Sequence, residues 1–189
     1  GSEMCIRDRR RTTKRRYTTF DRTKKMSLEE RLLKIKSNIE KVSSDIPRTI
    51  VAVTKTFSLD HIMPLINYGH MHYGENKVQE AEQKWSEIKK MNKELKIHMI
   101  GKLQTNKVKK ALRLFDFIHS LDNKKLAAKI SEEQEKQKIK PKIFIQINIG
   151  DESQKGGIRV DELEEFYNYC MELDLEIIGT MCLPPISND

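Results

Sequence analysis

Lys55 is the residue of this chain with the clearest chemical potential, because it directly follows the apolar run at 49–54 (TIVAVT). A continuous run of β-branched residues is typical of a strand buried on both faces, as in a parallel sheet. A lysine at the carboxyl end of such a strand can be partly desolvated, which favours the neutral, nucleophilic amine. Lys55 is therefore a candidate for Schiff-base chemistry with an aldehyde. The alternative, which is commoner for any single lysine, is a solvated side chain at the end of a strand.

Three further residues occupy positions from which they could contact a ligand. Asn76 follows a second strand-like segment, and its amide could hydrogen-bond a cofactor oxygen, cap the helix that comes next, or do both. His98 lies between Ile97 and Met99 in a third segment, so alternation places its ring on the opposite face, as an interior ligand contact or a core histidine. Met181 lies near the end of the last segment, where a methionine more often packs in the core than contacts a cofactor. The histidine spacing predicts no metal site.

The elements that would position these residues alternate along the chain. Apolar patterning predicts strands at 49–54, 71–75, 96–101, 115–120, 142–148 and 176–182, and helices at 27–43, 58–69, from 78 onward, 105–114, 122–137 and 160–173. Strict alternation indicates parallel strands with right-handed crossovers, in a doubly wound sheet or a (β/α)₈ barrel.

One observation favours the barrel, and a second indicates that the barrel would be incomplete. The chain has no GxGxxG or P-loop motif, which disfavours a nucleotide-binding doubly wound sheet. A barrel needs eight strands and about 250 residues, whereas six strands are predicted here. We therefore predict an α/β fold, a (β/α)₈ TIM-type barrel that is incomplete, with about six of its eight strands present.

The positive charge is concentrated at the beginning of the sequence. The net charge is +8, but residues 1–25 contain ten basic and three acidic side chains, so residues 26–189 carry only +1. A nearly neutral body argues against nucleic-acid binding as the function of the fold. We predict that 1–25 is a basic leader, disordered or non-native, and that 26–189 is the barrel domain.

The sequence supports neither a membrane-spanning protein nor a disulfide-stabilised one. No apolar run approaches the roughly 18 residues that a membrane span needs. The three cysteines have neither paired spacing nor a CxxC motif, which fits a reducing compartment better than a disulfide framework.

Five segments together resemble one family, the pyridoxal 5′-phosphate homeostasis proteins, whose barrel is similar to the N-terminal domain of alanine racemase. They are 51–55 (VAVTK), 74–80 (GENKVQE), 98–107 (HMIGKLQTNK), 145–148 (IQIN) with 151–156 (DESQKG), and 179–181 (GTM). They occur in the order of the family. The family's last two strands, with loops that hold the phosphate, have no counterpart in the sequence, and Thr54 stands where a serine is common.

The resemblance implies a barrel of pyridoxal phosphate fold type III and a role for each candidate residue. Lys55 matches the lysine that holds pyridoxal 5′-phosphate (PLP) as a Schiff base, and Asn76 matches an asparagine that lines the cofactor pocket. His98 and Met181 match positions near the cofactor ring. The implied function is intracellular vitamin B6 coenzyme homeostasis without robust turnover.

The alternative on the same barrel is a PLP-dependent amino acid racemase. Racemisation needs a positioned acid–base pair, which is not recognisable here, so the chain is expected to be a regulator or carrier more than an enzyme. The expected partners are the coenzyme and PLP-dependent client enzymes. We also expect a monomer located in the cytoplasm.

Overall fold

The computed structural model describes residues 26–42, 47–150 and 156–183 of the chain. The predicted leader at 1–25 lies outside these ranges. The helices are α1 (Leu28–Val42), α2 (Leu59–Asn67), α3 (Val78–Met91), α4 (Val108–Leu114), α5 (Lys124–Gln137) and α6 (Leu163–Glu172), with short 3₁₀ helices at Thr105–Lys107 and Val160–Glu162. The strands are β1 (Ala52–Val53), β2 (His72–Glu75), β3 (Lys96–Met99), β4 (Phe117–Leu121), β5 (Lys142–Asn148), β6 (Ile158–Arg159) and β7 (Glu176–Cys182).

The strands form one parallel sheet in which neighbours along the chain are neighbours in space. The order is β1-β2-β3-β4-β5, and β5 pairs with both β6 and β7. A doubly wound sheet reverses its strand order at a switch point, whereas a barrel adds each strand beside the previous one. The observed order is therefore that of a barrel wall, and the predicted α/β class is confirmed.

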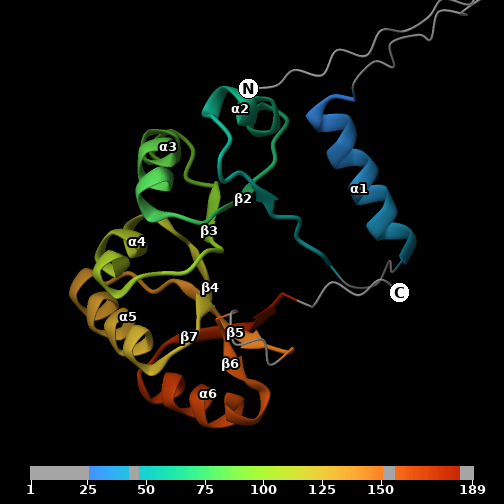
Figure 1. Ribbon diagram of the computed structural model, residues 1–189. Coiled ribbons are helices and arrows are strands. Elements are labelled where there is room, and N and C mark those ends of the chain that lie inside the picture. Colours follow the sequence, from blue (N-terminus) through green and yellow to red (C-terminus); the bar gives the residue numbers. More distant parts are fainter. Residues whose placement is uncertain (1–25, 43–46, 151–155, 184–189) are drawn as a thin grey trace, which may run out of the picture.

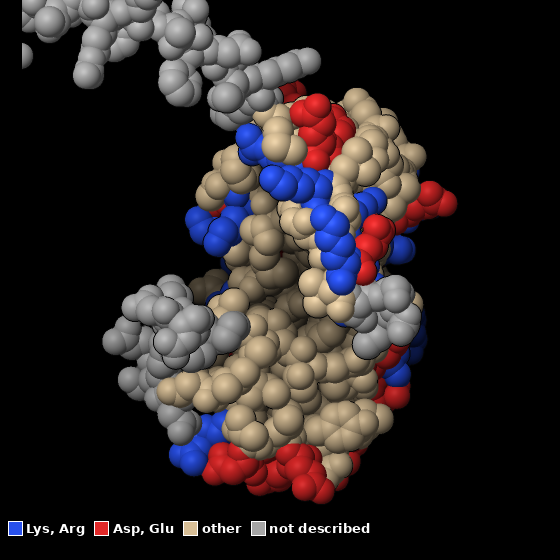
Figure 2. All heavy atoms as spheres, turned by 90° about the vertical axis from the view of Figure 1, so that its right-hand side faces the viewer, with Lys and Arg blue, Asp and Glu red and all other residues tan. Residues whose placement is uncertain are grey.

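Alternation along the strands separates the two faces of the sheet. Ile97, Met99, Ile118 and Ile143 are at most 1% exposed and belong to the core between the sheet and its helices. In Figure 1, α2 to α6 follow one another around this outer side, while α1 lies across from them. The side that carries α1 is hollowed, and the floor of the hollow consists of residues other than Lys, Arg, Asp and Glu (Figure 2).

The first helix begins as the sequence predicts. Ser27 and Glu30 form a capping box, in which the Glu30 amide donates to the Ser27 hydroxyl at 3.2 Å and the Ser27 amide donates to the Glu30 carboxylate at 2.8 Å. Leu32 is the buried residue of this helix. None of the helices in the described ranges is both long enough and apolar enough to span a membrane.

Candidate functional site

Lys55 and Asn76 leave the sheet at the same edge. The register pairs Val53 of β1 with Gly74 of β2, so Lys55 and Asn76 each lie two residues beyond a paired position. The Thr54 amide donates to the Gly74 carbonyl at 2.9 Å and continues this pairing past the end of β1. Both candidates therefore stand at the carboxyl ends of parallel strands, where ligands bind in barrels.

The surroundings of Lys55 differ from the expectation. We expected partial desolvation, but Lys55 is exposed. It begins a turn in which Thr56 has a φ of 72°. The structure therefore does not show the burial that we expected to make the Lys55 amine more nucleophilic. It shows an accessible primary amine at this position.

Asn76 is half-buried and is not the helix cap. The N-cap of α3 is Lys77, so the capping alternative for Asn76 is wrong. Gly101 approaches so closely that a Cβ there would lie 2.3 Å from the Asn76 carbonyl oxygen, which explains the glycine. The Asn76 amide makes no hydrogen bond with another residue of the described ranges and can act as donor or acceptor toward a ligand.

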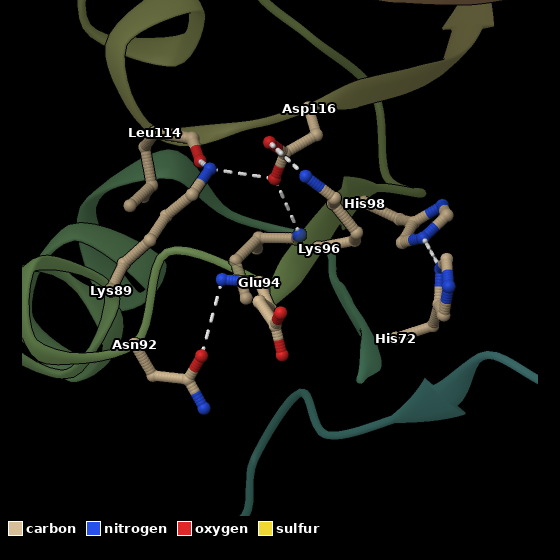
Figure 3. Close-up of polar contacts among 9 residues, drawn as sticks. His72, Lys89, Asn92, Glu94, Lys96, His98, Leu114 and Asp116 are labelled. Atoms are coloured by element: carbon tan, nitrogen blue, oxygen red, sulfur yellow. Dashed lines mark hydrogen bonds and ion pairs between the residues drawn. The ribbon is translucent and has the colours of Figure 1, made fainter. Parts of the chain in front are cut away.

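His98 lies on the inner face of the sheet, as predicted, in a chain of three imidazoles. His98 Nε2 is 2.9 Å from His72 Nδ1, and His98 Nδ1 is 2.8 Å from His119 Nε2. The ring also stacks on Phe117, with centroids 4.3 Å apart and planes 4° from parallel. Figure 3 shows the His72–His98 contact. Sequence reasoning missed both partners, although all three histidines fall on inward positions of consecutive strands.

The histidine chain is neutral. Burial, reinforced by the neighbouring imidazoles of His119 and His72, lowers the pKa of His98 to about 3. Burial also lowers the pKa of His119 to about 4. Each nitrogen–nitrogen hydrogen bond needs one donor and one acceptor, so neutral rings can satisfy both contacts at once. Both ring nitrogens of His98 are therefore already hydrogen-bonded to other histidines of the protein.

A separate ionic cluster lies at the amino end of β3 and β4. The Asp116 carboxylate accepts hydrogen bonds from the Lys89 ammonium at 2.6 Å and from the Ile97 amide at 2.9 Å, and Lys96 is 3.9 Å away (Figure 3). Lys89 also donates to the Leu114 carbonyl at 2.6 Å. Since Lys89 belongs to α3, this cluster anchors α3 to the sheet. It lies at the opposite end of the strands from Lys55 and does not contribute to the candidate site.

Met181 lies near the carboxyl end of β7, at the same edge of the parallel sheet as Lys55 and Asn76 but on a distant strand. It is half-buried on β7 and pairs with Gln146 of β5, while three strands separate β5 from β1. The polar motif at 151–155 lies outside the described ranges. In the part of the chain that is described, no three His, Cys, Asp or Glu side chains are grouped so that they could hold a metal ion.

Comparison with known proteins agrees with the motifs. Residues 31–189 match the family "Alanine racemase, N-terminal domain". A pyridoxal phosphate homeostasis protein of Aquifex aeolicus is 36% identical, with 85% of this chain and 72% of that protein covered. A protein of the same name from Pasteurella multocida is 33% identical, with 87% and 73% covered.

Solved structures support the same fold. PipY of Synechococcus elongatus PCC7942, solved with and without PLP, is 29% identical with a TM-score of 0.68, over 81% of this chain and 72% of that one. An alanine racemase of Clostridium difficile 630 is 15% identical with a TM-score of 0.56, over 80% of this chain and 40% of that one. The latter likeness concerns the fold alone. The resemblance inferred from the motifs is confirmed.

Proposed function

The chain belongs to the pyridoxal phosphate homeostasis proteins, within the family of alanine racemase N-terminal domains, and from this premise we propose that it binds PLP and acts in vitamin B6 coenzyme homeostasis. The PLP-bound structure of the similar protein PipY supports the binding part of this proposal. The name shared by the relatives supports the physiological part.

The observation that carries the proposal is the placement of Lys55 and Asn76 at the carboxyl ends of two paired parallel strands. Bound PLP supplies an aldehyde, and an amine that attacks it forms a C=N bond as water leaves. We assign the amine to Lys55, which is accessible, and a hydrogen bond to the coenzyme to Asn76, whose amide is uncommitted. These two side chains fit an aldehyde-bearing coenzyme at one edge of the sheet.

His98 and Met181 enter the proposal as pocket residues with a more limited role. Because both ring nitrogens of His98 are hydrogen-bonded to other histidines, His98 contributes packing and not a proton to a bound coenzyme. Met181 offers an apolar, adaptable side chain.

His98 and His119 do not supply the acid–base pair that the racemase alternative needs. Racemisation needs an acid–base pair near neutral pH on the two faces of the substrate carbon. The pKa of His98 is held at about 3 and that of His119 at about 4, so neither ring exchanges protons readily near pH 7. Reversible attachment at Lys55 is sufficient to hold a reactive aldehyde and release it to another amine.

The remaining parts of the proposal concern partners and place. We propose a monomer that passes the coenzyme to PLP-dependent client enzymes in the cytoplasm, with 26–189 as the coenzyme-binding domain and 1–25 as a basic leader. Cys170 and Cys182 are both free, which fits a reducing compartment.

Titration with PLP, followed by the absorbance of the coenzyme, tests the proposal. We expect a saturable Schiff-base band with the unmodified chain and with Lys77→Ala, and no such band with Lys55→Ala. Lys77 is a matched control because it is a nearby lysine whose side chain is 64% exposed. A band of equal size in Lys55→Ala would contradict the assignment. Exchange of amino acid α-protons faster than with free PLP would favour the racemase alternative.

A further inference from the structure

A second polar cluster lies beside the same strand ends, in the layer between the sheet and α3. Its centre is the side chain of Glu75, which is completely buried. The carboxylate oxygen Oε1 accepts hydrogen bonds from the Thr54 hydroxyl at 2.7 Å, the Lys84 ammonium at 2.8 Å and the Trp85 indole N–H at 2.9 Å. One oxygen atom therefore joins the end of β1, the end of β2 and α3.

Stability alone is a poor explanation for the Glu75–Lys84 ion pair. The side chain of Lys84 is 12% exposed and that of Glu75 is fully buried, so both charges lose hydration. Apolar residues of similar volume often stabilise a protein as well as such a pair does. The second carboxylate oxygen of Glu75, Oε2, has no hydrogen-bond partner in the described structure. The pair is better explained by what it holds in place.

What the pair holds in place is Thr54, the residue directly before Lys55. The Thr54 amide donates to the Gly74 carbonyl at 2.9 Å, and its hydroxyl donates to Glu75. Its carbonyl accepts a hydrogen bond from Lys84 Nζ at 2.8 Å. Every polar group of Thr54 is thus bonded, and two of these bonds end on the ion pair.

The turn that follows makes this anchoring matter for Lys55. The Phe57 amide donates to the Thr54 carbonyl at 3.1 Å and closes the turn. Thr56 has a φ of 72°, a left-handed conformation that is strained for a β-branched residue and persists only where its surroundings impose it. Because Lys55 is exposed, the backbone of this turn sets the direction of its side chain.

We propose that the Glu75–Lys84 ion pair, acting through Thr54, is a positioning device that fixes the turn carrying the Lys55 amine. This inference rests on the proposed role of Lys55 in binding PLP. Lys55 itself contacts the coenzyme, whereas Thr54, Glu75 and Lys84 act through the backbone.

Two variants of Thr54 and one of Lys84 test the device. Thr54→Val keeps the shape of the side chain and removes the hydroxyl, whereas the matched control Thr54→Ser keeps the hydroxyl. Lys84→Met keeps an unbranched chain of similar length and removes the charge that bonds both Glu75 and the Thr54 carbonyl. Thermal unfolding checks that each variant is folded.

The first readout needs no coenzyme. Hydrogen exchange of the Phe57 amide, which donates to the Thr54 carbonyl, reports the opening of the turn. We expect about tenfold faster exchange in Thr54→Val and Lys84→Met than in the unmodified chain, because each loses a hydrogen bond to a charged group. Thr54→Ser is expected to exchange within about twofold of the unmodified chain. The second readout is the rate of borohydride-trapped PLP attachment at Lys55, which we expect to fall in the same two variants and to be retained in Thr54→Ser.

The outcomes separate this inference from the proposed function. Faster exchange and slower attachment in Thr54→Val, with both restored in Thr54→Ser, would support the device. Unchanged exchange and attachment in both Thr54→Val and Lys84→Met would overturn it while leaving PLP binding intact. If Thr54→Val does not fold, Lys84→Met decides by the same two readouts. Absence of attachment at Lys55 in the unmodified chain would overturn the proposed function and this inference with it.

Discussion

Acid is expected to destabilise this chain through the buried histidines of the inner sheet face. His98 is 3% exposed and hydrogen-bonded at both nitrogens to His72 and His119. Protonation would place a charge in a poorly hydrated site and would remove the acceptor that one of these two hydrogen bonds needs. The folded chain therefore resists a proton that the unfolded chain accepts.

The magnitude follows from the pKa of His98. Burial and the neighbouring imidazoles lower it from 6.5 to about 3. Between these values the unfolded chain binds more protons than the folded chain, so stability is complete above pH 6.5 and is lost as the pH falls. Each pH unit in this window costs about 1.4 kcal/mol per such group. Acidification from pH 6.5 to 4.5 should therefore cost on the order of 2 kcal/mol through His98, because the unfolded histidine is already half protonated at pH 6.5. The pKa of His119, lowered to about 4, acts in the same direction.

Urea unfolding of the unmodified chain and of His98→Gln at these two pH values measures the effect. A glutamine amide can donate one hydrogen bond and accept another, as the neutral imidazole does, but it does not titrate. We expect the loss of unfolding free energy between pH 6.5 and 4.5 to be about 2 kcal/mol smaller in His98→Gln. His61→Gln, a change at an exposed histidine, should keep the pH dependence of the unmodified chain. The same pH dependence in all three proteins would refute the reasoning.

Three further changes have expected outcomes that urea unfolding at pH 7 can check. Gly101→Ala should lower the unfolding free energy by about 2 kcal/mol or more, because the new Cβ would lie 2.3 Å from the Asn76 carbonyl oxygen; a loss below about 0.5 kcal/mol would contradict that close approach. Asn123→Ala should cost about 1 kcal/mol, since the Asn123 side chain caps α5 by accepting a backbone N–H at 2.8 Å, and an unchanged stability would mean that the cap is not formed in solution. Trp85→Phe should cost about 1 to 3 kcal/mol because it removes one of the donors to the buried Glu75 carboxylate, and a neutral effect would argue against that hydrogen bond.

The order of the elements could be predicted because its signals are local. The predicted strands at 142–148 and 176–182 coincide with β5 and β7, whose apolar runs are long. The run at 49–54 forms a strand only at Ala52–Val53, since β1 pairs with β2 alone over two register positions. β6 was not predicted because a two-residue strand leaves no periodicity in the sequence.

The candidate site could be predicted only in part. The strand-end rule predicted that Lys55 and Asn76 lie at the carboxyl ends of β1 and β2, as the register shows. The exposure of Lys55 depends on which segments cover the turn, and the residue types near Lys55 do not predict that. The partners of Glu75 come from Thr54, 21 residues earlier, and from Lys84, 9 residues later. Such contacts depend on strand register and helix placement, which emerge only with the assembled sheet.

The central claim is that the amine of Lys55 holds PLP. The most direct measurement is to add PLP, reduce with borohydride, digest the chain and map the modified peptide, in the unmodified chain and in Lys55→Ala. We predict a single stoichiometric adduct at Lys55 that disappears in Lys55→Ala. Adducts spread over many lysines, or a pattern unchanged in Lys55→Ala, would contradict the claim.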